Sequence, residues 1–337
     1  RARLQAAERT HLREQAEGAD GRASRRQLVS TVMARERQSG KYASIVTRSD
    51  DGRLAVLNAP ADVARVLTQR FYSWMGGGRT FWYDRTALDS RGDDGKGLRA
   101  QIVAHGSDID MAAAGIPPKF GPVLDAFRTV PGAHAGLYAE CLQPISQPEW
   151  RRYWSSRGSR KSPGLTGVTN DMVKGLVDAQ HNDILAVLNH ALHIRHMFPE
   201  WVQRAIVPVS KVKGSNDVEL SRPITLVDVI QKASMSIVWG RVTDVWEEHG
   251  LLDSGQLGSR KGQNAQTALA MAVALSELAT ADHIPLYAIS TDISRCYDSI
   301  CFGVKELALL RLGLSREFID YYMQLDHRNV ADVVTAF

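Results

Sequence analysis

Two aspartates, Asp292 and Asp298, follow an apolar run in the C-terminal part of the chain, with Tyr297 directly before the second. Residues 286–289 favour a β-strand, and the apolar positions after Ser294 recur at helical spacing. Asp292 is therefore predicted to lie where a strand ends and a helix begins. A carboxylate there either caps the helix by accepting a backbone N–H bond or binds a metal ion at the mouth of a sheet. The local sequence favours the cap, so a metal site needs support from the rest of the chain.

Basic residues elsewhere in the chain suit an anionic ligand. Lys211 ends a predicted strand and Arg222 follows a short polar segment, so an antiparallel pair of strands would place the two side by side. Arg260 lies in a loop with Gly258, where a backbone can approach closely. Each cation alone is most simply a solvated surface residue. Together with an aspartate at a strand end, they supply the groups of phosphoryl transfer, carboxylates for Mg²⁺ and cations for a triphosphate.

Three other kinds of site lack their sequence patterns. His190, His193 and His196 lie on one predicted helix, but without the i, i+4 spacing and acidic base of a zinc protease. No GxSxG segment indicates a serine hydrolase. The glycines at 76–78 lack the lysine that follows in phosphate-binding loops. The three cysteines have neither zinc nor redox spacing, which predicts a reducing compartment.

Composition places the chain among ordinary globular proteins, because 44% of its 337 residues are hydrophobic and 23% are charged. The net charge is +4, and residues 1–41 hold ten Lys or Arg against five Asp or Glu. Such an excess suits a solvated helix or a nucleic-acid contact. No apolar run is long enough to span a bilayer, and no signal-peptide pattern opens the chain. We expect an intracellular protein, nuclear or cytoplasmic, that is not secreted and has no membrane partner.

The expected elements alternate short strands with long helices. Residues 45–57 predict a strand, a turn and a second strand, followed by a helix at 60–74. Residues 75–97 are glycine-rich and polar and predict a loop. From residue 145 onward, long helices, including one at 265–281, alternate with short strands that have charged tips. This order predicts an α+β enzyme core.

Five stretches, read in order, resemble the fingers and first palm motifs of reverse transcriptases: "KSPGLTGVTNDMVK", "FPEWVQRAIVPVSKVKG", "SRPITLVDVIQKASMSIVWGRV", "GQLGSRKGQNAQTAL" and "YAISTDISRCYDSI". The resemblance is greatest to non-LTR (LINE-like) retrotransposon enzymes and covers residues 145–337. Residues 49–75 are similar to the segment that precedes the fingers in that family. The implied fold is a partial right-hand polymerase, the fingers and the start of the palm, with a helical, basic N-terminal segment.

The resemblance implies roles for the residues around the first aspartate. Asp292 would match the first metal-binding aspartate of the palm, which makes it catalytic, and Ile293 would supply a nearby backbone contact to the metal. Tyr297 would be the steric gate that excludes a 2′-hydroxyl. Asp298 belongs to the family pattern and is expected to be structural, capping the following helix.

The resemblance also implies contacts with nucleotide and nucleic acid. Lys211 and Arg222 would contact the incoming triphosphate, and Gly258 and Arg260 would line the template path. The implied cofactor is Mg²⁺, with Mn²⁺ as a substitute. The implied partners are an RNA template, a DNA primer and dNTPs, with the oligomeric state left open.

The sequence departs from the family pattern in several motifs, and one departure concerns whether the active site is complete. Thr166 stands where the family's "PGxDG" turn has aspartate, and "GSRKGQNAQT" is an imperfect copy of its motif, which puts the fine template contacts in doubt. No tyrosine-flanked Asp-Asp pair occurs, although a two-metal site needs more than one carboxylate. The sequence begins with Arg1 and ends in "RNVADVVTAF", which is similar to a strand that precedes the YxDD hairpin. We expect a piece of a longer product with half an active site.

These patterns predict three segments. Residues 1–44 are an Arg-rich, helical, mobile segment, and residues 45–144 are a lead-in region with a glycine-rich loop. Residues 145–337 are the reverse transcriptase fingers and a partial palm, truncated before the YxDD hairpin. The expected function is part of an RNA-directed DNA polymerase that transfers nucleotides to a primer 3′-OH on an RNA template. The alternative is a degenerate or domesticated remnant that binds nucleic acid without catalysis.

Overall fold

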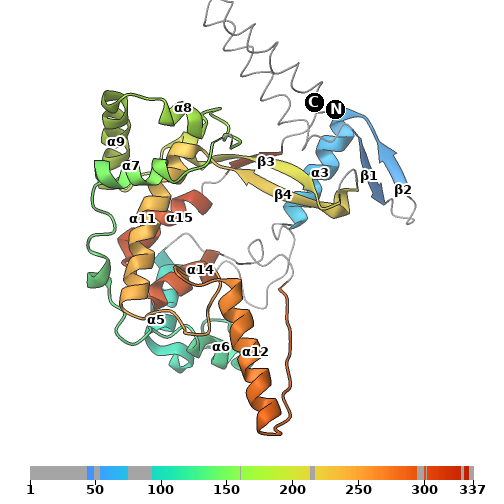
Figure 1. Cartoon of the computed structure of the whole chain (residues 1–337), viewed down its shortest axis with the longest axis vertical. Coiled ribbons are helices and arrows are strands. Elements are labelled where there is room, and N and C mark those ends of the chain that lie inside the picture. The colour runs from blue at the N-terminus through green and yellow to red at the C-terminus, as the bar shows by residue number, and fades with distance from the viewer. Residues whose placement is uncertain are drawn as a thin grey trace, which may run out of the picture.

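The computed structural model describes residues 44–48, 54–74, 93–159, 161–212, 217–293, 300, 302–327 and 330–333. Helices and small sheets are mixed, as the predicted α+β class requires (Figure 1). The strands are β1 (Ile45–Arg48), β2 (Leu54–Leu57), β3 (Gln203–Ser210), β4 (Ser221–Leu226) and β5 (Val330–Val333). The α-helices are α3 (Pro60–Trp74), α5 (Asp93–His105), α6 (Gly121–Asp125), α7 (Gln147–Ser155), α8 (Asn170–Lys174), α9 (Asp178–His193), α10 (Pro199–Val202), α11 (Val229–Glu248), α12 (Ala265–Ala281), α14 (Phe302–Arg311) and α15 (Arg316–His327). Short 3₁₀ turns are η1 (Gly106–Asp108), η2 (Pro118–Phe120), η3 (Ala135–Tyr138) and η4 (Val218–Leu220).

The strands form two small sheets beside α3 (Figure 1). β1 and β2 pair antiparallel, and the second sheet has the order β4-β3-β5, with β4 antiparallel and β5 parallel to β3. Apolar side chains at helical spacing on α3 pack against both sheets. The buried residues of this core are Ile45, Val63, Leu67, Phe71, Ile206 and Val218.

The largest core joins α7, α9, α11 and α15. Local sequence starts two of its helices. Ser146 and Glu149 form a capping box at α7, and Asp228 accepts bonds from two backbone N–H groups at the start of α11. Trp239 of α11 packs edge-on against Phe318 of α15, with ring centroids 5.6 Å apart. This helical body supports the β3–β4 hairpin from one side.

A further core joins the lead-in region to α14. α5 and α6 pack against Leu307, and a buried ion pair lies in the same interface. Arg99 Nε is 2.8 Å from Glu306 Oε2, with the two side chains 1% and 4% exposed, and Arg316 Nη2 is 2.9 Å from the same oxygen. Two cations thus compensate one buried carboxylate. The predicted boundary at 144/145 stays a prediction, and this contact crosses it.

The structure confirms several predicted elements and corrects two. The predicted helices at 60–74 and 265–281 are α3 and α12. The predicted strand at 286–289 is wrong, because the described residues provide no neighbouring strand to pair with it. The predicted loop is wrong at 93–97, because α5 begins at Asp93.

The predicted Arg-rich segment at 1–44 lies outside the described residues, apart from Ser44. Among the helices of the described part, none has both the length and the apolar character needed to cross a membrane.

Candidate functional site

The β3–β4 hairpin brings Lys211 and Arg222 together. Val209 lies opposite Arg222 in the register, and the Lys211 N–H donates to the Leu220 carbonyl at 2.7 Å, so the pairing continues past β3. Because side chains alternate along a strand, Lys211 falls on the same face as Val209 and Arg222. Both cations are exposed. The predicted antiparallel pairing is confirmed, and it places the two cations diagonally across the hairpin, because Arg222 lies opposite Val209. Their contact with a triphosphate stays a prediction.

The two faces of this hairpin differ in burial. Ile206 and Pro208 point to the inner face and are buried, Ile206 within the core formed by α3. On the outer face, Val209 and Ile224 are 38% and 44% exposed beside the two cations. An open apolar floor next to paired positive charges suits a ligand with a flat apolar part and an anionic part.

Asp292 and Ile293 lie in extended backbone after α12 and are exposed, Ile293 by 66%. No hydrogen bond or ion pair among the described residues joins Asp292 to Lys211 or Arg222. The placement of these three residues around one triphosphate stays a prediction. Tyr297 and Asp298 lie outside the described residues.

The described residues do not fit a two-metal site. They hold no group of three His, Cys, Asp or Glu side chains arranged around a metal. Mg²⁺ is commonly held by one or two carboxylates plus substrate phosphates, and Asp292 offers one carboxylate. A second ion 3.5–4 Å away, as in two-metal enzymes, requires further ligands. The metal role of Asp292 and Ile293 stays a prediction.

The segment that leads to Asp292 is apolar and exposed. α12 is rich in apolar residues and has no buried side chain, and it points away from the other elements (Figure 1). Leu278, Tyr287 and Ile289 are 60%, 86% and 90% exposed. Exposed apolar surface of this extent marks an interaction site.

Arg260, predicted to line the template path, organises its own loop. Its Nε and Nη2 lie 3.0 and 2.6 Å from the two carboxylate oxygens of Glu247, and Nη1 donates to the Asp253 carbonyl at 2.9 Å. The hydrogen bond from Arg260 lowers the pKa of Glu247, and the same bond raises the pKa of Arg260. Gly258 lies in this loop, where its carbonyl accepts a bond from Gln256 at 2.9 Å. The template contact of both residues stays a prediction.

Thr166, which departs from the family pattern, contacts the start of α11. Its hydroxyl donates to Asp228 Oδ2 at 2.5 Å, while Asp228 Oδ1 accepts from the N–H groups of Ile230 and Gln231 at 2.9 and 3.1 Å. A Cβ on Gly164 would lie 2.6 Å from the Asp228 backbone nitrogen. Glycine therefore permits the close approach through which this loop docks on the helix.

Asp228→Ala is expected to lower the free energy of unfolding by about 1–2 kcal/mol, because it removes a helix cap and the acceptor for Thr166. Urea titration of the two proteins measures this difference. Asp228→Asn is the matched control, since it keeps an oxygen that can cap and should cost less. Equal stability of Asp228→Ala and wild type would contradict the assignment.

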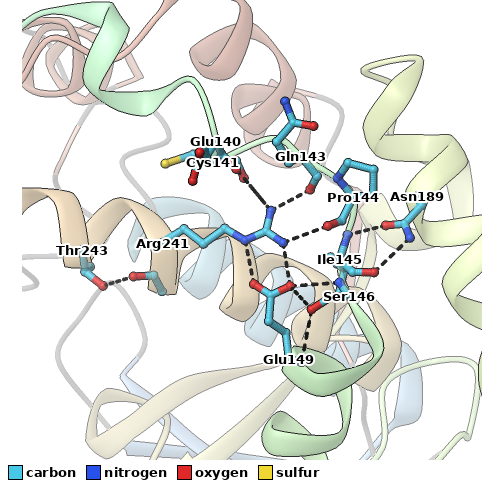
Figure 2. A network of polar contacts seen from close by, with 11 residues as sticks. Glu140, Cys141, Gln143, Pro144, Ile145, Ser146, Glu149, Asn189, Arg241 and Thr243 are labelled. Carbon is cyan, nitrogen blue, oxygen red and sulfur yellow. Dashed lines mark hydrogen bonds and ion pairs between the residues drawn. The ribbon is translucent and has the colours of Figure 1, made fainter.

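Arg241 of α11 fixes α7 and the loop before it (Figure 2). Its Nε and Nη2 bind the two carboxylate oxygens of Glu149 at 2.8 and 2.9 Å, and Nη1 and Nη2 donate to carbonyls of Gln143 and Pro144 at 2.6 and 3.0 Å. The hydrogen bonds from Arg241, with those from Ser146, lower the pKa of Glu149 to about 2. The five N–H donors of one guanidinium thereby link α11 to α7 and to the loop before it, which are about 100 residues away in sequence.

Comparison with known proteins agrees with the resemblance of the sequence motifs to reverse transcriptases. No family model matches the chain. The chain is similar to a transposon polymerase. This relative, described as a probable RNA-directed DNA polymerase from transposon BS of Drosophila melanogaster, is 27% identical over 124 residues. The matched residues are 36% of this chain and 14% of the relative, so the similarity spans a small part of that protein.

This similarity supports a relationship to reverse transcriptases, as the motifs predict. The non-LTR type, the metal and the roles of individual residues stay predictions.

Sequence reasoning did not single out several residues that shape this region. Asp228 precedes an apolar helix and could have been found as an N-cap signal. Trp150 and Trp154 are spaced i, i+4, which is the signal of a core-facing helix stripe, and both are buried in the largest core. The role of Arg241 had no local signal, because its partners are carbonyls about 100 residues away.

Proposed function

We propose that this chain is part of an RNA-directed DNA polymerase of the non-LTR retrotransposon type and provides the fingers and the start of the palm. Such a polymerase adds deoxynucleotides to a primer 3′-OH along an RNA template. The β3–β4 hairpin would hold the triphosphate, and Asp292 would contribute one carboxylate to a metal site. Bound Mg²⁺ supplies charge neutralisation in reactions of this class.

The similarity to the transposon polymerase carries this proposal. The β3–β4 hairpin supports it, because Lys211 and Arg222 share one exposed face above an apolar floor. The exposed apolar surface of α12 and the segment before Asp292 also supports it. We assign that surface to contacts with other palm strands of the polymerase, since a strand-forming segment needs a pairing partner.

The test is nucleotide binding by the hairpin. Arg222→Ala and Lys211→Ala are each expected to weaken binding of dTTP with Mg²⁺ about 10-fold, because each removes a hydrogen bond to a charged group worth roughly 1.5–3 kcal/mol. Isothermal titration calorimetry measures the affinities.

Arg65→Ala with Lys119→Ala is the control, since both residues are exposed cations on other elements. Equal affinity in wild type and both hairpin variants would overturn the assignment of the triphosphate to β3–β4. A loss of similar size in the control would show that binding follows net charge and not this site.

A further inference from the structure

A second cluster of cations lies on α7, α8 and the loop between them, apart from the β3–β4 hairpin. Its members are exposed and basic: Arg151, Arg152, Arg157, Lys161 and Lys174. Against these five cations stand Glu149 of α7, which Arg241 binds, and Asp171 in the first turn of α8. This surface therefore presents an excess of positive charge, which favours an anionic partner.

A cavity of about 250 Å³ opens among these cations, lined by Trp150, Arg151, Trp154, Ser155, Lys174 and His181. The two tryptophan rings meet edge to face, with centroids 5.3 Å apart. The volume lies below the roughly 300–1,000 Å³ of sites for drug-sized ligands, so it suits a single ring system such as a nucleobase. The walls are apolar and the cations stand at the rim.

The polar groups of this cavity are mainly hydrogen-bond donors. Trp150 Nε1–H donates to His181 Nδ1 at 3.0 Å, so a neutral His181 carries its own hydrogen on Nε2. Trp154 is 5% exposed, and its indole N–H has no partner among the described residues. An indole nitrogen is a donor only. The exposed donors of the cavity are therefore those of Arg151 and Lys174, which suit a ligand with acceptor oxygens.

The arginines beside the cavity, Arg151 and Arg157, have exposed contacts that a phosphate group could replace. Arg151 pairs with Asp178 at 3.1 Å, but the two side chains are 60% and 77% exposed, and exposed pairs of this kind contribute little. The Arg157 guanidinium lies 4.5 Å from the centroid of the Tyr153 ring. Stacked arginine and tyrosine planes are surfaces on which unpaired bases stack.

We propose that α7, α8 and the loop between them bind a single-stranded polynucleotide, with one base in the cavity and successive phosphates on Arg151, Arg157 and Lys174. Three further exposed cations, Arg152, Arg157 and Lys161, lie outside the cavity lining, which suits the repeated charge of a polynucleotide. An acidic peptide with an aromatic anchor is the competing class. The site does not depend on the β3–β4 hairpin or on Asp292, so it goes beyond the proposed polymerase function.

Fluorescence anisotropy with a labelled oligouridylate tests the site in the whole chain. Arg151→Ala with Lys174→Ala is expected to weaken binding about 10-fold at roughly 0.1 M salt. The double variant should also reduce the salt slope by about 1.4, since each single-strand phosphate contact contributes about 0.7. Arg65→Ala with Lys119→Ala is the matched control and should leave affinity and slope unchanged. Circular dichroism confirms that each variant is folded.

Unchanged affinity in the α7–α8 variant, or tighter binding of an aspartate-rich tyrosine peptide than of the oligouridylate, would overturn the proposal. Equal binding of oligodeoxythymidylate would support it and show that the 2′-hydroxyl is not read; weaker binding would support RNA as the strand. Photo-cross-linking of an iodouridine oligomer provides an independent readout. It should label residues 147–157, Lys174 or His181, and labelling only at other residues would count against the site.

The same variants separate this proposal from the polymerase function. Arg151→Ala with Lys174→Ala should leave dTTP binding intact, and Arg222→Ala should leave oligouridylate binding at α7 intact. The polymerase proposal and the polynucleotide-site proposal can therefore fail independently, and the two binding assays show which one has failed.

Discussion

Asp292→Ala is expected to lower primer extension by about 10²- to 10³-fold in a polymerase that contains this chain, the size of loss seen when a catalytic charge-stabilising group is removed. Under the proposed function, Asp292 is the first carboxylate of the metal site, and the described residues hold no other group of three potential ligands that could serve instead. The measurement is extension of a labelled DNA primer on an RNA template with dNTPs and Mg²⁺. Loss should appear in the rate at saturating dNTP, because the carboxylate acts on the reacting phosphate and not on base selection.

Asp282→Ala is the matched control for this experiment. Asp282 is also an exposed aspartate, ten residues earlier and at the end of α12, so its loss changes net charge equally. Extension by this control should match wild type. Undiminished extension by Asp292→Ala would contradict the assignment of Asp292 and, with it, the proposed function. Tyr297→Val, which should admit ribonucleotides, tests the neighbouring steric gate separately.

Elements whose cause is local were predictable from the sequence. α3 begins and ends at the predicted residues 60 and 74, since proline at its first position and spaced apolar residues specify it. The β3–β4 pairing was also predictable, because two strand-forming runs joined by a short polar segment favour a hairpin. The meeting of Lys211 and Arg222 follows from that pairing alone.

Elements whose cause is distant were not predictable. Residues 286–289 have strong strand propensity, yet a strand exists only with a partner, and among the described residues none lies beside them. The charge of Arg260 suggested a nucleic-acid contact, whereas its two-point bond to Glu247 depends on how the loop returns to α11. Strand propensity and charge therefore identified the candidate residues. Tertiary contacts decided which strand pairs and which partner each charged side chain binds.

Arg241→Met is expected to lower the free energy of unfolding by about 3 kcal/mol. The substitution keeps the apolar stem but leaves Glu149 and several loop carbonyls without their donor, and loss of hydrogen bonds to a charged group in a half-buried network costs roughly 1.5–3 kcal/mol. The Arg241 side chain is 19% exposed. Urea titration near neutral pH measures the difference. Arg151→Met, on α7 beside Glu149, is the control, since the pair of Arg151 with Asp178 is 60% and 77% exposed and should contribute less than about 1 kcal/mol.

The same network predicts a pH dependence. Hydrogen bonds from Arg241 hold the pKa of Glu149 at about 2 in the folded chain, below its ordinary value of 4.5. A lowered carboxylate pKa stabilises the fold fully above pH 4.5, and this contribution is lost as the pH falls toward 2. Glu149→Gln removes the titrating group, so the stability gap between it and wild type should narrow across that window. A gap that stays constant from neutral pH down to pH 2 would show that the Arg241–Glu149 bonds do not stabilise the ionised form.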